Sequence, residues 1–115
     1  SRSGGLWGIA VYGWLHHLVE LLHSGHAEWD PLTWRALREH KAGMVQRLAY
    51  MAQHGVPAAA ALVEEYRPVA AWARTLQVLL LRWSAAAAPP PVQRQAHDLL
   101  LEMAATEGRV LRRLL

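Results

Sequence analysis

The sequence lacks several residue types, and each absence excludes a class of protein. The 115 residues include no cysteine, no phenylalanine and no asparagine, and there is one lysine and one isoleucine. Without cysteine, the chain has no disulfide scaffold, no thiol nucleophile and no thiolate ligand for zinc or an iron–sulfur cluster. The absence also fits a reducing compartment, so we expect a cytoplasmic protein.

The predominance of arginine among the basic residues has the same origin as these scarcities. Lysine, asparagine, isoleucine and phenylalanine share A/T-rich codons, so their depletion indicates a GC-rich genome, and 11 of the 12 basic residues are arginine. The net charge of +3 is spread over both halves of the sequence. Its densest basic group, Arg109, Arg112 and Arg113, falls at a predicted helix C-terminus, where cations complement the helix dipole. We therefore expect no nucleic-acid partner.

The composition that remains is that of a small folded domain. Hydrophobic residues make up 53% of the chain and charged residues 18%, which excludes an intrinsically disordered protein. The first five residues, Ser1 to Gly5, resemble a linker or an expression scar, and we expect residues 6–115 to form a single domain. The most hydrophobic stretch, residues 6–19, carries no formal charge but is shorter than the roughly 20 residues of a membrane span, so no transmembrane segment is expected.

Glycine and proline divide the domain into helices. Gly25 follows one amphipathic stretch, Pro31 opens the next, Gly55 ends it, and three consecutive prolines at 89–91 enforce a later break. No stretch shows the alternation typical of a strand. These signals predict four helices at about residues 6–23, 31–54, 57–88 and 92–115.

Apolar periodicity within these helices predicts how they pack. The third helix has apolar residues at alternating spacings of four and three, which is typical of a helix packed at a shallow angle: Leu62, Tyr66, Val69, Ala73, Leu76, Leu80, Trp83 and Ala87. In the second helix, Lys41 occupies a position where the heptad requires an apolar residue. Short connections favour an all-α, antiparallel, up-down four-helix bundle, with three long spectrin-like helices as the alternative.

The first predicted helix is apolar on most of its circumference. Between Leu6 and Leu22, twelve residues are apolar, more than a short helix buries inside a four-helix bundle. The excess indicates a docking or self-association surface, for which tryptophan and tyrosine are common anchors. We expect the interface residues to be Trp7, Tyr12, Trp14, Trp29 and Trp34. Our leading hypothesis is a non-enzymatic protein–protein interaction module.

Seven histidines support a second hypothesis, binding of a transition metal or haem. His16, Glu20 and His23 share one face of the first helix, and an antiparallel fourth helix would bring His97 close to them. Glu20 and His23 have the Glu-x-x-His spacing of di-iron bundles. No second Glu-x-x-His occurs in the sequence, so a complete di-iron site is not encoded.

A third hypothesis is RNA cleavage. Arg35 and His40 fit the Arg-x-x-x-x-His pattern and therefore resemble the motif of HEPN-type ribonucleases, which are also small helical bundles. The resemblance covers six residues and implies that Arg35 and His40 would act together on RNA. The sequence has no glycine-rich phosphate loop.

Overall fold

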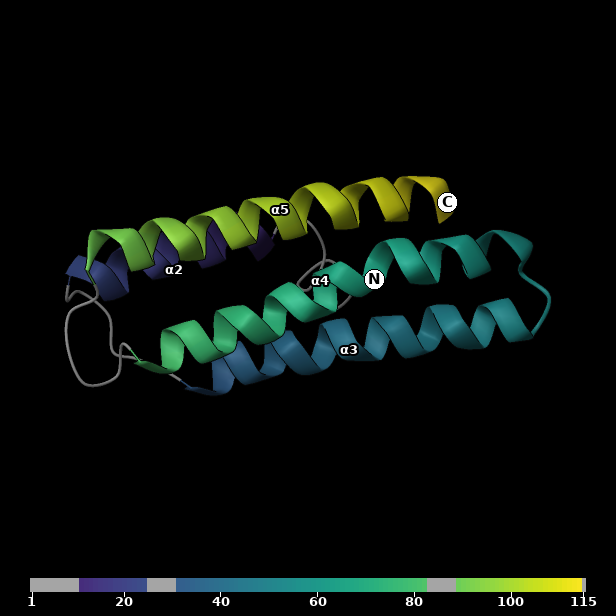
Figure 1. The fold of residues 1–115 in the computed structure, drawn as a ribbon, viewed down its shortest axis with the longest axis horizontal. Helices are drawn as coiled ribbons and strands as arrows, with labels where there is room; N and C mark the ends of the chain where they lie inside the picture. The colour runs from purple at the N-terminus through teal and green to yellow at the C-terminus, as the bar shows by residue number, and fades with distance from the viewer. Residues whose placement is uncertain (1–10, 25–30, 83–88, 115) are drawn as a thin grey trace.

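Four α-helices account for nearly all of the chain that the computed structural model describes, which is residues 11–24, 31–82 and 89–114 (Figure 1). They are α2 (Val11–Ser24), α3 (Pro31–Gln53), α4 (Pro57–Leu81) and α5 (Pro90–Leu114). Within these ranges no residue forms a strand. The side chains of residues 21–24 and 31 are outside the description. The prediction of an all-helical fold is confirmed.

The helices form an antiparallel four-helix bundle rather than three long helices. α4 packs against α3 on one side and against α5 on the other, and α2 packs mainly against α5 (Figure 1). Each helix runs opposite to the next in the chain, as the short connections predicted. The polypeptide therefore goes up and down through the bundle, with α2 and α5 side by side.

The described part of α2 is shorter than the other three helices. Its 14 residues give a length of about 21 Å, whereas the 23 to 25 residues of α3, α4 and α5 give about 35 to 38 Å. His16 of α2 lies against His97 of α5, and Tyr12 reaches Glu107. α2 therefore lies along the part of α5 between these two residues.

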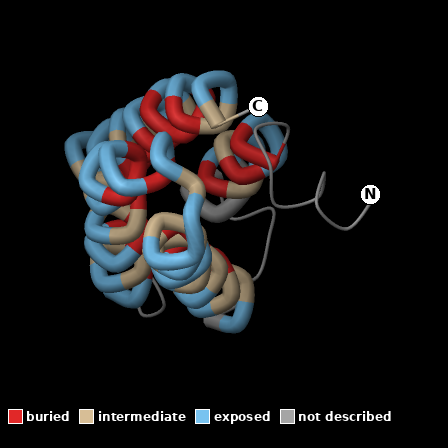
Figure 2. The backbone as a smooth tube through the Cα atoms, turned by 90° about the vertical axis from the view of Figure 1, so that its right-hand side faces the viewer, coloured by how far each residue is buried: buried red, intermediate tan, exposed pale blue. Residues whose placement is uncertain are grey.

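The bundle has one apolar core, formed by the inward sides of all four helices (Figure 2). The predicted face of α4 is buried at Leu62, Tyr66, Val69, Ala73, Leu76 and Leu80, and the last two predicted members, Trp83 and Ala87, lie outside the described residues. On α5 the structure buries Leu100 completely and Leu99 partly, and the core-facing side of this helix also includes Glu107 and Gly108.

The turn between α3 and α4 follows from its glycine and proline. Gly55 has a φ of 92°, and the N–H of Val56 donates to the carbonyl of Met51 at 3.0 Å, which is the pattern of a Schellman C-cap. Pro57 then starts α4, where its missing N–H costs nothing. α4 continues unbroken through Pro68, so this proline does not split the helix.

No helix within the described residues has the length and apolar character needed to cross a membrane. The apolar stretch at residues 6–19 is described only from Val11 onward.

Two glycine substitutions test this account of the α3–α4 turn. Gly55→Ala should lower the free energy of unfolding by about 1 kcal/mol, because a residue with a Cβ rarely adopts a positive φ. Gly43→Ala is the matched control inside α3, where an added Cβ meets no atom within 4 Å. It should raise stability by about 0.5 to 1 kcal/mol through helix propensity. Urea unfolding followed by circular dichroism measures both, and equal effects of the two substitutions would contradict the assignment of Gly55.

Candidate functional site

The five predicted interface residues fall into three groups. Trp14 is on the surface of α2, with 54% of its area exposed. Tyr12 and Trp34 are 3% and 1% exposed, and both belong to the apolar core. Trp7 and Trp29 lie outside the described residues. The structure thus corrects the expectation for Tyr12 and Trp34, because the bundle itself buries them.

α2 explains why neighbouring aromatic residues have such different surroundings. Val11, Tyr12, Leu15 and Val19 follow the spacing of one helix face and are buried. Trp14 is two residues beyond Tyr12, about 200° further around the helix. Leu18, one turn after Trp14, is half-buried at the edge of the core. Trp14 and Leu18 therefore form an apolar strip outside the main core, which we call the α2 outer strip.

The predicted metal ligands His16 and His97 do lie together. Their Nδ1 atoms are 2.5 Å apart, and their ring planes are within 5° of parallel. Burial lowers the pKa of His16, the adjacent His97 lowers it further, and the Glu20 carboxylate opposes both effects. Glu20 is exposed, and the side chain of His23 is outside the description. Across the described residues, no three histidine, aspartate or glutamate side chains are clustered to hold a metal ion.

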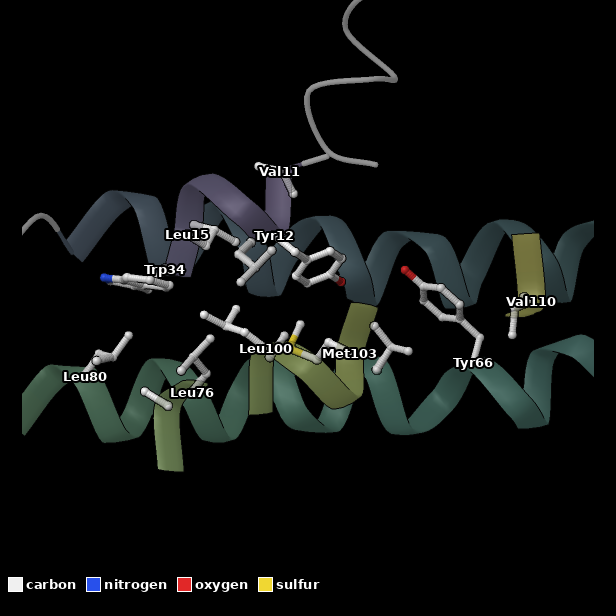
Figure 3. Packing of buried hydrophobic residues seen from close by; sticks show 14 of the residues in the cluster. Val11, Tyr12, Leu15, Trp34, Tyr66, Leu76, Leu80, Leu100, Met103 and Val110 are labelled. Atoms are coloured by element: carbon white, nitrogen blue, oxygen red, sulfur yellow. The ribbon is translucent and has the colours of Figure 1, made fainter. Parts of the chain in front are cut away.

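A buried charge network, not singled out from the sequence, occupies the middle of the bundle. Lys41 Nζ lies 2.9 Å from Glu107 Oε1 and 3.1 Å from Glu107 Oε2. The hydroxyl of Tyr12 donates to Oε1 at 2.9 Å, and the hydroxyl of Tyr66 donates to Oε2. Figure 3 shows the two tyrosine hydroxyls pointing inward toward each other. We call these four residues the Glu107 network.

Each helix contributes one residue to the Glu107 network. Tyr12 comes from α2, Lys41 from α3, Tyr66 from α4 and Glu107 from α5. The side chains of Lys41 and Glu107 are 0% and 2% exposed. Lys41 Nζ also lies 5.3 Å from the centre of the Tyr12 ring, within the range of a cation–π contact.

Burial dominates the electrostatics of the Glu107 network. It lowers the pKa of Lys41, although the attraction of Glu107 opposes this shift. Burial also raises the pKa of both Tyr12 and Tyr66, and the negative charge of Glu107 raises each further. The tyrosines therefore remain protonated donors. Because the Glu107 network is buried away from solvent, it is better suited to aligning the four helices than to chemistry on an external substrate.

The sequence contained one signal of this network. Lys41 replaced an apolar residue at a heptad position that faces the core, which indicates a buried cation needing a buried anion. Glu107 could not be identified as that anion, because nine acidic residues were available and the pairing depends on how α3 and α5 are positioned. Tyr12 was assigned to the predicted interface and Tyr66 to the apolar face of its helix, so neither was recognised as a hydrogen-bond donor.

The two residues of the ribonuclease pattern have different surroundings. Arg35 is exposed, and its Nε donates to Glu39 at 3.0 Å. His40 is half-buried, and burial lowers its pKa, as does the neighbouring Lys41. In the C-terminal arginine group, Arg113 pairs with Glu65 of α4, and Arg109 donates to Thr106 at 3.2 Å. These arginines make contacts within the bundle.

Comparison with known proteins gives no family assignment. No family model, no curated protein and no solved structure matches the chain.

Removing one member of the buried ion pair should be costly. Glu107→Gln leaves the Lys41 ammonium buried without its carboxylate, and we expect a loss of about 3 to 5 kcal/mol of stability. The double variant Lys41→Met/Glu107→Gln should lose less than the sum of the single variants, because the unpaired charge is gone. Glu39→Gln, which breaks the exposed pair with Arg35, is the control and should change stability by less than about 0.5 kcal/mol. Strictly additive losses in a urea-unfolding cycle would contradict the pairing.

The raised pKa values of Tyr12 and Tyr66 predict loss of stability in alkali. Each tyrosine ionises at its ordinary value of 10.0 in the unfolded chain but stays protonated in the folded one, so its contribution is fully present below pH 10.0 and is lost as the pH rises further. The lowered pKa of Lys41 acts in the opposite direction only up to its ordinary value of 10.5. Stability should therefore fall above about pH 10.5.

Unfolding free energies at about pH 10.5 and about pH 11.5 measure this dependence, because the opposing contribution of Lys41 ends at pH 10.5. Tyr66→Phe should make the fall shallower, since one of the two protonated tyrosines is removed. Tyr50→Phe is the control, because Tyr50 is 61% exposed and outside the network. The same slope in Tyr66→Phe and the wild type would rule out the explanation.

Proposed function

We propose that this chain is a non-enzymatic helical-bundle module that works by protein–protein contact, through the α2 outer strip of Trp14 and Leu18. The observation that carries the proposal is the exposure of Trp14, more than half of whose area is accessible on a helix that packs mainly against α5. Tryptophan is among the residues that contribute most to interfaces, because it buries a large area with few rotatable bonds.

The division of α2 into two apolar sides supports the proposal. Of its first ten residues, four apolar side chains fill the core: Val11, Tyr12, Leu15 and Val19. These four side chains are the contribution of α2 to the core, and Trp14 is not needed to complete it. Exposure of an indole to water is unfavourable in free energy, and covering it with the apolar surface of a partner is favourable.

The partner we commit to is a second copy of the chain. Two α2 helices facing each other across a twofold axis would cover Trp14 of each copy with the outer strip of the other, as in the symmetric interfaces of most homodimers. Such a contact needs no other protein. We place the module in the cytoplasm, in keeping with a sequence that contains no cysteine.

Trp14→Glu tests the proposal. A carboxylate on the outer strip should prevent association and leave a folded monomer, because the side chain is exposed and lies outside the core. We expect the wild type to be dimeric by light scattering and the variant to be monomeric with an unchanged circular dichroism spectrum.

Leu101→Glu is the matched control, since Leu101 of α5 is 60% exposed and lies on another helix. It should retain the wild-type mass. A wild type that remains monomeric at every concentration, or a Trp14→Glu variant that stays dimeric, would disprove self-association through α2. An unfolded Trp14→Glu variant would disprove the assignment of Trp14 to the surface.

A further inference from the structure

The imidazole rings of His16 on α2 and His97 on α5 meet edge to edge. Their Nδ1 atoms are 2.5 Å apart, their ring centres are 4.8 Å apart, and their planes are within 5° of parallel. A ring nitrogen lies about 1.15 Å from the centre of a five-membered ring with bonds of about 1.35 Å, so 4.8 Å is close to the largest separation of ring centres that these two nitrogens allow. The nitrogens therefore lie on the line between the ring centres, and the two rings share nearly one plane.

This arrangement has a place for one proton between the facing nitrogens. The lone pair or the N–H bond of an imidazole nitrogen points outward in the plane of its ring, so each Nδ1 is aimed at the other. When one Nδ1 carries a hydrogen, it donates to the lone pair of the other and joins the two helices. Two facing lone pairs, or two facing N–H groups, repel each other. The contact therefore requires one proton between the two nitrogens.

The protonation state of the pair decides whether the contact is favourable. A neutral pair and a singly charged pair each leave one Nδ1 free to accept the hydrogen bond. When both rings are protonated, both Nδ1 atoms carry hydrogen and both rings are positive, so the acceptor is lost and the rings repel. Burial lowers the pKa of His16, and the adjacent His97 lowers it further. If α2 left α5, His16 would regain its ordinary pKa of 6.5 and bind protons more readily, so acid favours separation.

The other charged groups around the pair do not replace this effect. Glu20, on α2, is exposed and only partly opposes the lowering of the His16 pKa. On α5, Arg94 and Asp98 line a hollow to which His97 does not contribute, so they lie on another side of that helix. Among the described residues, α3 and α4 supply no charge that acts on His16. The titration of the contact is therefore governed by the two histidines and Glu20.

α2 is the helix whose attachment depends most on one neighbour. It packs mainly against α5, whereas α4 packs against both α3 and α5. A helix with few neighbours can separate from a folded protein while the rest stays packed. The histidine contact lies in the only extensive packing that α2 makes within the described residues, one turn beyond the bond from Tyr12 to Glu107. A change in this contact therefore bears directly on how firmly α2 is held.

We propose that the contact between His16 and His97 is an acid-sensitive attachment of α2 to the bundle. With one proton between the two Nδ1 atoms, α2 stays against α5. When both nitrogens carry hydrogen in mild acid, α2 separates from α5 more often and exposes its apolar side, which includes Leu15 and Val19. The attachment does not depend on the proposed dimer contact, because Trp14 is on another side of α2.

Amide hydrogen exchange at about pH 7.5 and about pH 5, on either side of the ordinary histidine pKa, tests the proposal. Protection factors corrected for the intrinsic pH dependence of exchange are compared. We expect α2 to be less protected than α4 at both pH values, since it opens while the other helices stay packed. In the wild type, the protection of α2 should fall about tenfold more in acid than in His16→Gln/His97→Gln, the effect of a one-unit change in pKa. Glutamine takes up no proton in this range.

Three further variants separate the histidine contact from other causes. His97→Gln should show an intermediate fall, because burial of His16 remains. His17→Gln is the matched control, since His17 is exposed on the same helix, and it should behave as the wild type does. Trp14→Glu should keep the full fall, because the attachment acts within one chain. Equal protection of α2 and α4, the same fall in the double variant as in the wild type, or loss of the fall in His17→Gln or Trp14→Glu would overturn the proposal.

Discussion

The carboxylate of Glu107 is the group on which the alignment of the bundle depends. It accepts hydrogen bonds from Tyr12 and Tyr66 and pairs with the ammonium of Lys41, so side chains from three helices converge on one residue of the fourth. Apolar packing alone tolerates some sliding and rotation of helices, because it has no direction. A buried carboxylate does not tolerate such movement. Shifting one helix by one residue moves its side chains about 1.5 Å along the axis and 100° around it. The carboxylate then loses a hydrogen-bond donor, and a buried charge is left poorly compensated.

This constraint also determines what α2 presents to its surroundings. The bond from Tyr12 to Glu107 turns one side of α2 toward the centre of the bundle, and the contact between His16 and His97 fixes its rotation one turn further along. Trp14, between these two residues in the sequence, must then face elsewhere, and it is exposed. The proposed interaction surface is thus a consequence of how α2 is attached to the bundle.

Much of the fold could be predicted, because it depends on local chemistry. Gly55 and Pro57 mark the turn between α3 and α4, and the apolar spacing from Leu62 to Leu80 identifies the buried side of α4. The meeting of His16 with His97 also followed from antiparallel order. The assignments of Tyr12 and Trp34 to an interface were wrong, since the sequence marks an aromatic residue as apolar without saying whether its own chain or a partner covers it.

The sequence by itself determined the order of the helices in the described part of the chain and the inward face of α4, since helix propensity, capping and periodicity act between residues close along the chain. Only the tertiary structure decided that Glu107 is the anion paired with Lys41, because their 66-residue separation is closed by the packing of two helices and by no local rule. It likewise decided that Tyr12 points into the bundle and Trp14 out of it. A helix has many rotations that bury apolar residues, and the need to satisfy one buried charge selects among them.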